Sequence, residues 1–121
     1  ASVGNWLVCK YIKNKSDAKV VFNGDGADEL CGGYLYMGCA PTDIEFDAEC
    51  KRLLENIHYF DVLRSDRTIS SHGLEARTPF LDRDFVNSYL SIPISLRRTK
   101  VGCEKMLLRN SFKDLLPPEI L

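Results

Sequence analysis

The sequence lacks the features that mark several classes of protein. No run of apolar residues approaches the ~18 that a membrane-spanning helix requires, and 16 basic residues nearly balance 17 acidic ones, for a formal net charge of −1. A balanced chain offers no surface of a single sign to nucleic acid or to anionic lipid. We therefore expect neither nucleic acid nor a membrane among its partners.

Cysteines that could pair or hold a metal are also lacking. The five cysteines are an odd number, and none has the C-x-x-C spacing of redox motifs and zinc sites. His58 and His72 have no partner at ligand spacing either. We interpret the cysteines as free thiols in a reducing compartment, which predicts a cytoplasmic protein.

The length of the chain sets a third limit. Its 121 residues suit one domain, but they are few for an enzyme that must bind two substrates and a nucleotide. The chain begins without a signal-peptide pattern and stops soon after Pro117 and Pro118 end a helix. We expect a piece of a longer protein, with further strands before Ala1.

Apolar spacing predicts a mostly helical portion of an α/β domain with one parallel strand. Residues 2–14 have an imperfect helical pattern, and residues 19–22 are the nearly all-apolar run typical of a strand buried on both faces. A long helix should begin at the T-x-x-E capping box of Thr42 and Glu45 and continue beyond Leu63. Two shorter helices are predicted, one capped by Asp82 and one over residues 103–113 with Met106, Leu107 and Phe112 inward.

The segment VVFNGDGADELCGGY, residues 20–34, places glycines and acids directly after the predicted strand. It matches neither the G-x-G-x-x-G fingerprint nor the Walker pattern. Ligands of open α/β sheets bind at the carboxyl ends of strands, and acids beside a phosphate need a cation between them, so a nucleotide here demands magnesium. The alternative is a plain turn in which Asp28 caps a helix, and spacing alone supports the two interpretations about equally.

Two further groups of charges have a structural interpretation. Asp61 and Arg64 are three residues apart on one face of the long helix, and the residues alone favour an exposed ion pair over an active-site pair. In the segment SHGLEARTPFLD, Glu75 and Arg77 flank an alanine in a stretch too short for a helix of its own. We interpret Glu75 and Asp82 as structural acids, with a buried ion pair that fixes a bend.

Four stretches resemble consecutive segments of one known family. They are VVFNGDGADELCGGYLY, CAPT, HYFDVLRSDRTISSHGLEARTPFLD and EKMLLRNSF, and they are similar to the synthetase domain of glutamine-hydrolysing asparagine synthetases. The agreement is collinear over residues 5–121. It implies that residues 1–121 are part of a domain with the N-type ATP pyrophosphatase fold, an adenine-nucleotide α-hydrolase-like (HUP) fold. The amino-terminal glutaminase domain and the pyrophosphate loop of that family do not occur in this chain.

The resemblance implies a nucleotide site and a metal site in the acidic loop. Asn23 and Gly24 match a Ser-Gly pair whose backbone lies against the adenylate, and Gly26 belongs to the same cofactor-binding loop. Asp28 matches an aspartate that ligates magnesium on the pyrophosphate. Lys105 is interpreted as a phosphate-side or structural cation. The cofactors expected from the resemblance are ATP and Mg²⁺.

Three residues acquire catalytic roles through the same resemblance. Asp25 stands where the family usually has a glutamate that is important for forming the β-aspartyl-AMP intermediate. Asp61 and Arg64 match a helical Asp and Arg of the aspartyl-adenylate site. The resemblance therefore favours a functional role for this pair over a surface ion pair. In the implied reaction the aspartate side chain attacks the α-phosphate of ATP, and ammonia derived from glutamine displaces AMP to give asparagine.

The sequence also departs from the family pattern. Asn23 replaces serine and keeps a hydrogen-bonding side chain, and Asp25 replaces glutamate with a side chain one methylene shorter. Cys31 replaces phenylalanine and His72 replaces tryptophan, so the wall around the substrate amino acid should differ in shape. One alternative is a β-lactam-type or other amide ligase of the same fold, but those relatives place tyrosine at the position of Asp25. Another is a degenerate, non-catalytic nucleotide-binding homologue. We expect these 121 residues alone to be inactive, and the resemblance allows a homodimer of the full-length protein.

Overall fold

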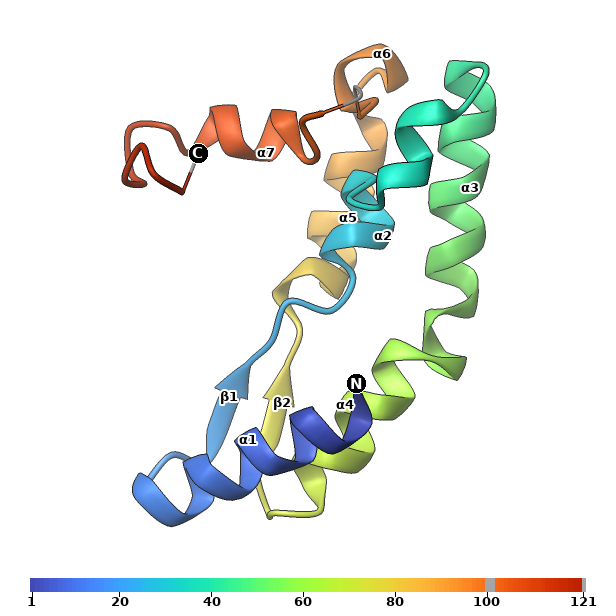
Figure 1. The fold of residues 1–121 in the computed structure, drawn as a ribbon. Helices are drawn as coiled ribbons and strands as arrows, with labels where there is room; N and C mark the ends of the chain where they lie inside the picture. The colour runs from blue at the N-terminus through green and yellow to red at the C-terminus, as the bar shows by residue number, and fades with distance from the viewer. Residues whose placement is uncertain (100–101, 121) are drawn as a thin grey trace.

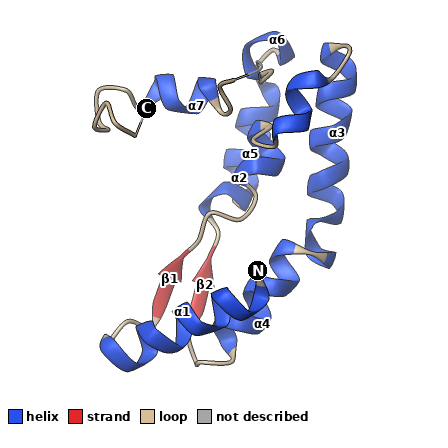
Figure 2. Cartoon of the chain, viewed as in Figure 1, coloured by secondary structure: helices blue, strands red, loops and turns tan. Residues whose placement is uncertain are grey.

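The computed structural model describes residues 1–99 and 102–120. Helices dominate, and a pair of short strands forms the sheet of the described part (Figure 2). The helices and strands are α1 (Ser2–Lys15), β1 (Val20–Phe22), α2 (Ala27–Cys31), α3 (Asp43–Asn56), α4 (Asp61–Ser70), β2 (Glu75–Arg77), α5 (Arg83–Ser91), α6 (Ile94–Arg97) and α7 (Met106–Ser111). The 3-10 helices are η1 (Leu35–Cys39), η2 (Ile57–Tyr59) and η3 (Pro79–Leu81). Among the described residues, no helix combines the length and the apolar character needed to cross a membrane.

β1 and β2 pair in parallel, with Val21 opposite Ala76. The prediction of an α/β portion is confirmed, but the prediction of a single strand is wrong, because Glu75–Arg77 forms the second one. The apolar pattern did not predict β2, because this strand has one apolar residue, Ala76, between two charged ones. Those charges form an ion pair with Arg77 Nη2 2.5 Å from Glu75 Oε1, and both side chains are more than half exposed. The predicted buried ion pair at a bend is therefore wrong as well.

One face of this sheet is covered and the other is open. Val21 and Ala76 pack against a small core of Cys9 from α1 with Ile69 and Leu74 from α4 and the loop after it. Figure 1 shows α1 and α4 lying across the strands at this level. Phe22 on the opposite face is 77% exposed. The predicted burial of the strand on both faces is therefore wrong for the described residues, because burial on both faces needs a layer of helices on each.

The predicted long helix is interrupted. Thr42 caps α3 as expected, since its Oγ1 accepts a hydrogen bond from the amide of Glu45 at 3.2 Å. Phe60 then leaves the helical conformation, with φ −119° and ψ −91°, and α4 begins at Asp61. No glycine or proline marks this break, and apolar residues continue across it, so periodicity alone joined the two helices. The break moves Asp61 from the later part of the predicted helix to the first turn of α4.

The remaining helices form a second packed group beyond the carboxyl ends of the strands (Figure 1). Its core has two parts, Leu30, Cys31 and Tyr89 in one and Met37, Phe46 and Cys50 in the other. Asp82 caps α5 as predicted, because its Oδ1 accepts from the amides of Asp84 and Phe85 at 3.0 Å. The last predicted helix is shorter than expected: α7 covers Met106–Ser111, and Met106 and Phe112 stay 38% and 45% exposed.

Candidate functional site

The acidic loop leaves the carboxyl end of β1 and leads into α2. The amide of Asn23 donates to the carbonyl of Arg77 at 3.0 Å, which extends the strand pairing by one residue. Asn23 Oδ1 then accepts from the amide of Asp25 at 3.1 Å and so turns the chain. Gly26 is the N-cap of α2 with φ 90°, a conformation that residues with a Cβ rarely adopt. A Cβ there would also lie 2.3 Å from Leu81 Cδ2, so this position requires glycine.

Asp25, Asp61 and Arg64 meet at the end of this loop. Arg64 Nη2 forms an ion pair with Asp61 Oδ1 and lies 3.9 Å from Asp25 Oδ1. The three side chains are only 14% to 28% exposed. The prediction that the residues alone favoured, an exposed ion pair of Asp61 and Arg64, is thus wrong. The tertiary structure also brings the charge of Asp25 to this pair from the loop after β1. Asp25 Oδ2 and Arg64 Nε are buried without a hydrogen-bond partner among the described residues, which leaves polar capacity for a ligand.

Asp28 lies one residue inside α2, with its side chain 40% exposed. It does not cap the helix, because the N-cap is Gly26 and no side chain caps that end. The helix-cap alternative is therefore wrong. Its carboxylate contacts Lys105, with Nζ 2.7 Å from Oδ1. The two pass over Gly33, where a Cβ would lie 1.8 Å from Asp28 Oδ1, so a glycine makes room for this pair.

The residues present fit magnesium only as part of a nucleotide complex. Among residues 1–99 and 102–120, no group of three His, Cys, Asp or Glu side chains could hold a metal ion. Mg²⁺ is commonly bound through one or two carboxylates together with substrate phosphates. Asp28 suits that arrangement, because it is a half-exposed carboxylate beside a lysine that can face a phosphate.

A cavity of about 220 Å³ opens between the loop, α1 and α4. Its polar lining comes from Asn5, Asn23, Asp25 and Ser65, and the other lining residues, such as Ile12 and Val21, are apolar. Asn23 Nδ2 is buried there without a hydrogen-bond partner in the described structure. An orphaned amide beside an apolar wall suits a flat ligand with hydrogen-bond acceptors at its edge. Gly24 is exposed, with no atom within 4 Å of where its Cβ would lie.

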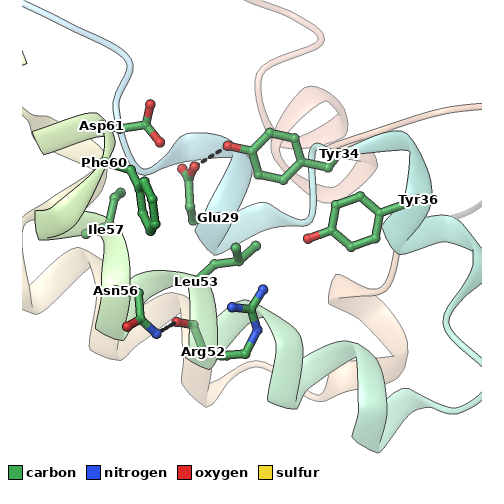
Figure 3. A pocket seen from close by; sticks show the side chains of 9 residues that line it. All are labelled: Glu29, Tyr34, Tyr36, Arg52, Leu53, Asn56, Ile57, Phe60 and Asp61. Carbon is green, nitrogen blue, oxygen red and sulfur yellow. Dashed lines mark hydrogen bonds between the residues drawn. The ribbon is translucent and has the colours of Figure 1, made fainter. Parts of the chain in front are cut away.

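A second cavity, of about 290 Å³, is lined in part by Asp61 (Figure 3). Glu29 and Tyr34 face it, and the Tyr34 hydroxyl donates to Glu29 Oε1. The sequence interpretation missed both residues, although a second acid directly after Asp28 in the glycine-rich loop was a usable signal. Glu29 is only 5% exposed. Burial first, and then the hydrogen bond and charge of Glu29, raise the pKa of Tyr34 above its ordinary value, so the phenol keeps its proton and remains a donor.

Two residues that depart from the family pattern, Cys31 and His72, lie outside both cavities. Cys31 is fully buried against Leu30 and Tyr89, and burial raises the pKa of its thiol. The His72 ring packs against Trp6 at a tilt of 53°, with ring centroids 4.7 Å apart. Neither residue lines the two cavities beside Asp25 and Asp61. All five cysteines are free thiols, as expected.

Fold and site together define an α/β protein with a charged, glycine-rich loop at the carboxyl end of a parallel strand, where such sheets bind ligands. A sequence model of the asparagine synthase family matches residues 1–44 and 40–121. The chain therefore belongs to the asparagine synthase family, and the resemblance in its motifs is confirmed.

Curated relatives support the same assignment. The chain is 54% identical to a glutamine-hydrolyzing asparagine synthetase of Gallus gallus, 51% identical to one of Mus musculus and 50% identical to one of Homo sapiens. Each alignment covers 100% of this chain. The chain spans only 22% of the length of each of these relatives.

Proposed function

We propose that these residues are the adenylate-site part of an ATP-dependent ligase that converts aspartate to asparagine. In the full-length protein, the complete polypeptide that carries these residues, the domain would have the HUP-type ATP pyrophosphatase fold. The observation that carries the proposal is the grouping of Asp25, Asp61 and Arg64 at the end of the acidic loop. The asparagine synthetases among its relatives support the choice of substrate.

The chemistry explains why both signs of charge are present. The side-chain carboxylate of aspartate attacks the α-phosphate of ATP, and pyrophosphate leaves. Ammonia from glutamine then attacks the resulting β-aspartyl-AMP and displaces AMP. Two anions must meet in the first step, so cations have to offset the charge that develops on the phosphate.

The site residues divide this work by position. Arg64 is held between Asp61 and Asp25 and would place its guanidinium toward the reacting groups. Asp25, with one carboxylate oxygen free of partners in the described structure, would orient the amino-acid substrate or accept a proton from the attacking nitrogen. Magnesium at Asp28 would neutralise charge on the departing pyrophosphate. Asn23, Gly24 and Gly26 would bring the backbone close to the nucleotide.

Further parts of the proposal follow from the same family membership. The full-length protein would use glutamine as its nitrogen donor and assemble as a homodimer. Its free thiols favour the reducing environment of the cytoplasm. Asp25 weighs against a β-lactam-type ligase, because that class has tyrosine there. The alternative hypothesis is a non-catalytic homologue. Turnover by the full-length protein distinguishes this hypothesis from the proposed ligase.

The test is turnover by the full-length protein with aspartate, ATP, Mg²⁺ and either glutamine or ammonium. We expect asparagine, AMP and pyrophosphate in equal amounts. Absence of asparagine with both nitrogen donors would refute the proposal and favour the non-catalytic homologue.

Asp28→Asn examines the metal role within the same assay. Loss of the carboxylate should slow ATP–pyrophosphate exchange about 10²-fold or more and raise the magnesium concentration needed for half-maximal rate. Asp17→Asn is the matched control, because Asp17 is an exposed aspartate in the loop between α1 and β1. An Asp28→Asn variant with the magnesium dependence of the wild type would remove Asp28 from the metal site.

A further inference from the structure

The cavity beside Asp61 has an uneven charge distribution. Figure 3 shows the carboxylates of Glu29 and Asp61 on one side, with Leu53, Ile57 and Phe60 forming apolar wall. Glu29 is 5% exposed, so its carboxylate has lost nearly all contact with bulk water. A buried carboxylate is costly unless a hydrogen bond or a cation compensates it.

The cations around this cavity are already engaged elsewhere. Arg52, the basic residue of the lining, donates from Nε and Nη2 to the two oxygens of Glu49, at 2.7 and 2.8 Å. Arg64 pairs with Asp61. Among residues 1–99 and 102–120, no lysine or arginine forms an ion pair with Glu29.

Tyr34 orients Glu29 without neutralising it. Its hydroxyl donates to Oε1, which leaves the second oxygen of the carboxylate for another donor. The rings of Tyr34 and Tyr36 line the same cavity (Figure 3). The electron-rich faces of aromatic rings attract cations as well.

We propose that this cavity receives a primary ammonium group of a substrate and that Glu29, oriented by Tyr34, is the residue that binds it. The inference rests on the proposed function, which brings two such groups to the site: the α-ammonium group of aspartate and ammonium as the incoming nitrogen. Both share the same chemistry, a small cation with several N–H donors. Phosphate and carboxylate groups are repelled by Glu29 and Asp61, and about 290 Å³ is too little for a nucleotide together with an amino acid.

Glu29→Gln in the full-length protein tests the proposal. Glutamine has the same shape and keeps a carbonyl to accept from Tyr34, so the variant removes charge with little change in packing. Glu55→Gln is the matched control, because Glu55 is an exposed glutamate on α3. Thermal unfolding of each variant verifies that the fold is retained.

Two Michaelis constants distinguish the sources of the ammonium group. A rise of roughly tenfold or more in KM for aspartate during ATP–pyrophosphate exchange, without a nitrogen donor, means that the cavity holds the amino acid. A similar rise in KM for ammonium during asparagine formation, with normal exchange, means that it holds the incoming nitrogen. Either result supports the site. Unchanged constants in Glu29→Gln overturn it.

A binding measurement separates this inference from the proposed function. Line broadening of ¹³C-methylammonium by the full-length protein needs no turnover, and it should be lost in Glu29→Gln and kept in Glu55→Gln. If the wild type makes no asparagine but shows this pattern, the proposed function fails and the ammonium site stands. If the wild type makes asparagine but methylammonium binding is absent or insensitive to Glu29, the ammonium site fails and the function stands.

Discussion

Arg64 is the central residue of the candidate site, because its guanidinium group contacts both of the acids there. It lies between two carboxylates from different elements, in contact with Asp61 and 3.9 Å from Asp25. The three groups are partly buried, so their charges are screened less than on an open surface. Asp25 and Arg64 each keep a buried polar atom with no partner in the described structure. Such unsatisfied atoms are few in folded proteins, and a bound ligand would supply the missing partners of these two.

Arg64→Ala therefore has a predicted catalytic effect. We expect ATP–pyrophosphate exchange by the full-length protein to slow about 10²-fold or more, because a preorganised cation at the phosphate is lost. Arg67→Ala on the same helix is the control, since Arg67 is exposed and lines neither cavity. Equal rates in the two variants would show that Arg64 is only a structural partner of Asp61.

At the scale of elements, the junction of β1 and α2 places the site. The strand ends at Phe22, and the loop must turn within a few residues so that α2 can start at Ala27. Gly26 makes that turn in the left-handed region, against Leu81 of η3. Gly24 is two residues away and has open space around it. The two glycines thus have different reasons to be glycine.

Alanine substitutions at Gly26 and Gly24 should distinguish a requirement for the backbone conformation from a requirement for space beside the chain. Gly26→Ala should lower the free energy of unfolding by at least about 1–2 kcal/mol, from backbone strain alone, and the clash with Leu81 adds to that. Gly24→Ala should change stability by less than about 0.5 kcal/mol but raise the KM for ATP, because the new methyl group occupies the space proposed for the adenylate. Urea denaturation and ATP titration measure the two effects. Similar losses of stability in both variants would contradict this division.

At the scale of the whole molecule, a buried ion pair connects helices that are far apart in sequence. Arg97 Nη2 of α6 lies 2.5 Å from Asp47 Oδ1 of α3, and the arginine side chain is 2% exposed. Lys51 binds the other oxygen of Asp47 at 2.7 Å from a more exposed position. Burial pushes the pKa of Asp47 upward, but the hydrogen bonds from Arg97 and Lys51 outweigh it and hold the pKa below the ordinary value.

Asp47→Asn should be among the most destabilising polar substitutions in the chain. It leaves the Arg97 charge buried without its counter-charge, at a cost of about 3–5 kcal/mol. Lys51→Met, which removes the exposed partner, should cost about 1 kcal/mol or less. Chemical denaturation at neutral pH measures both. Equal effects of the two substitutions would show that burial of Arg97 does not matter.

The same pair predicts a dependence on pH. The folded-state pKa of Asp47 is depressed, so its contribution to stability is present above the unfolded-state value of about 3.9 and is lost as the pH falls through the folded-state pKa. The difference in stability between the wild type and Asp47→Asn should therefore shrink below about pH 4. A difference that stays constant to lower pH would assign the effect to packing and not to charge.

Local patterns predicted several elements well. The caps Thr42 and Asp82 start their helices as expected, because a side-chain oxygen that meets backbone amides within three residues is a local interaction. Periodicity failed where the outcome depended on distant partners. It did not show the break at Phe60, and it did not identify Glu75–Arg77 as a strand, because that segment becomes one only by pairing with β1.

The sequence by itself determined the family of this protein and the identity of its acidic loop, because those are properties of residue order. Only the tertiary structure decided which charges act together. Asp25, Asp61 and Arg64 share a site because β1 and α4 bring them there, and Glu29 becomes a buried acid because α2 packs it beside a cavity. Charge interactions depend on distance and on exclusion of water, and the chain acquires both only when its elements pack.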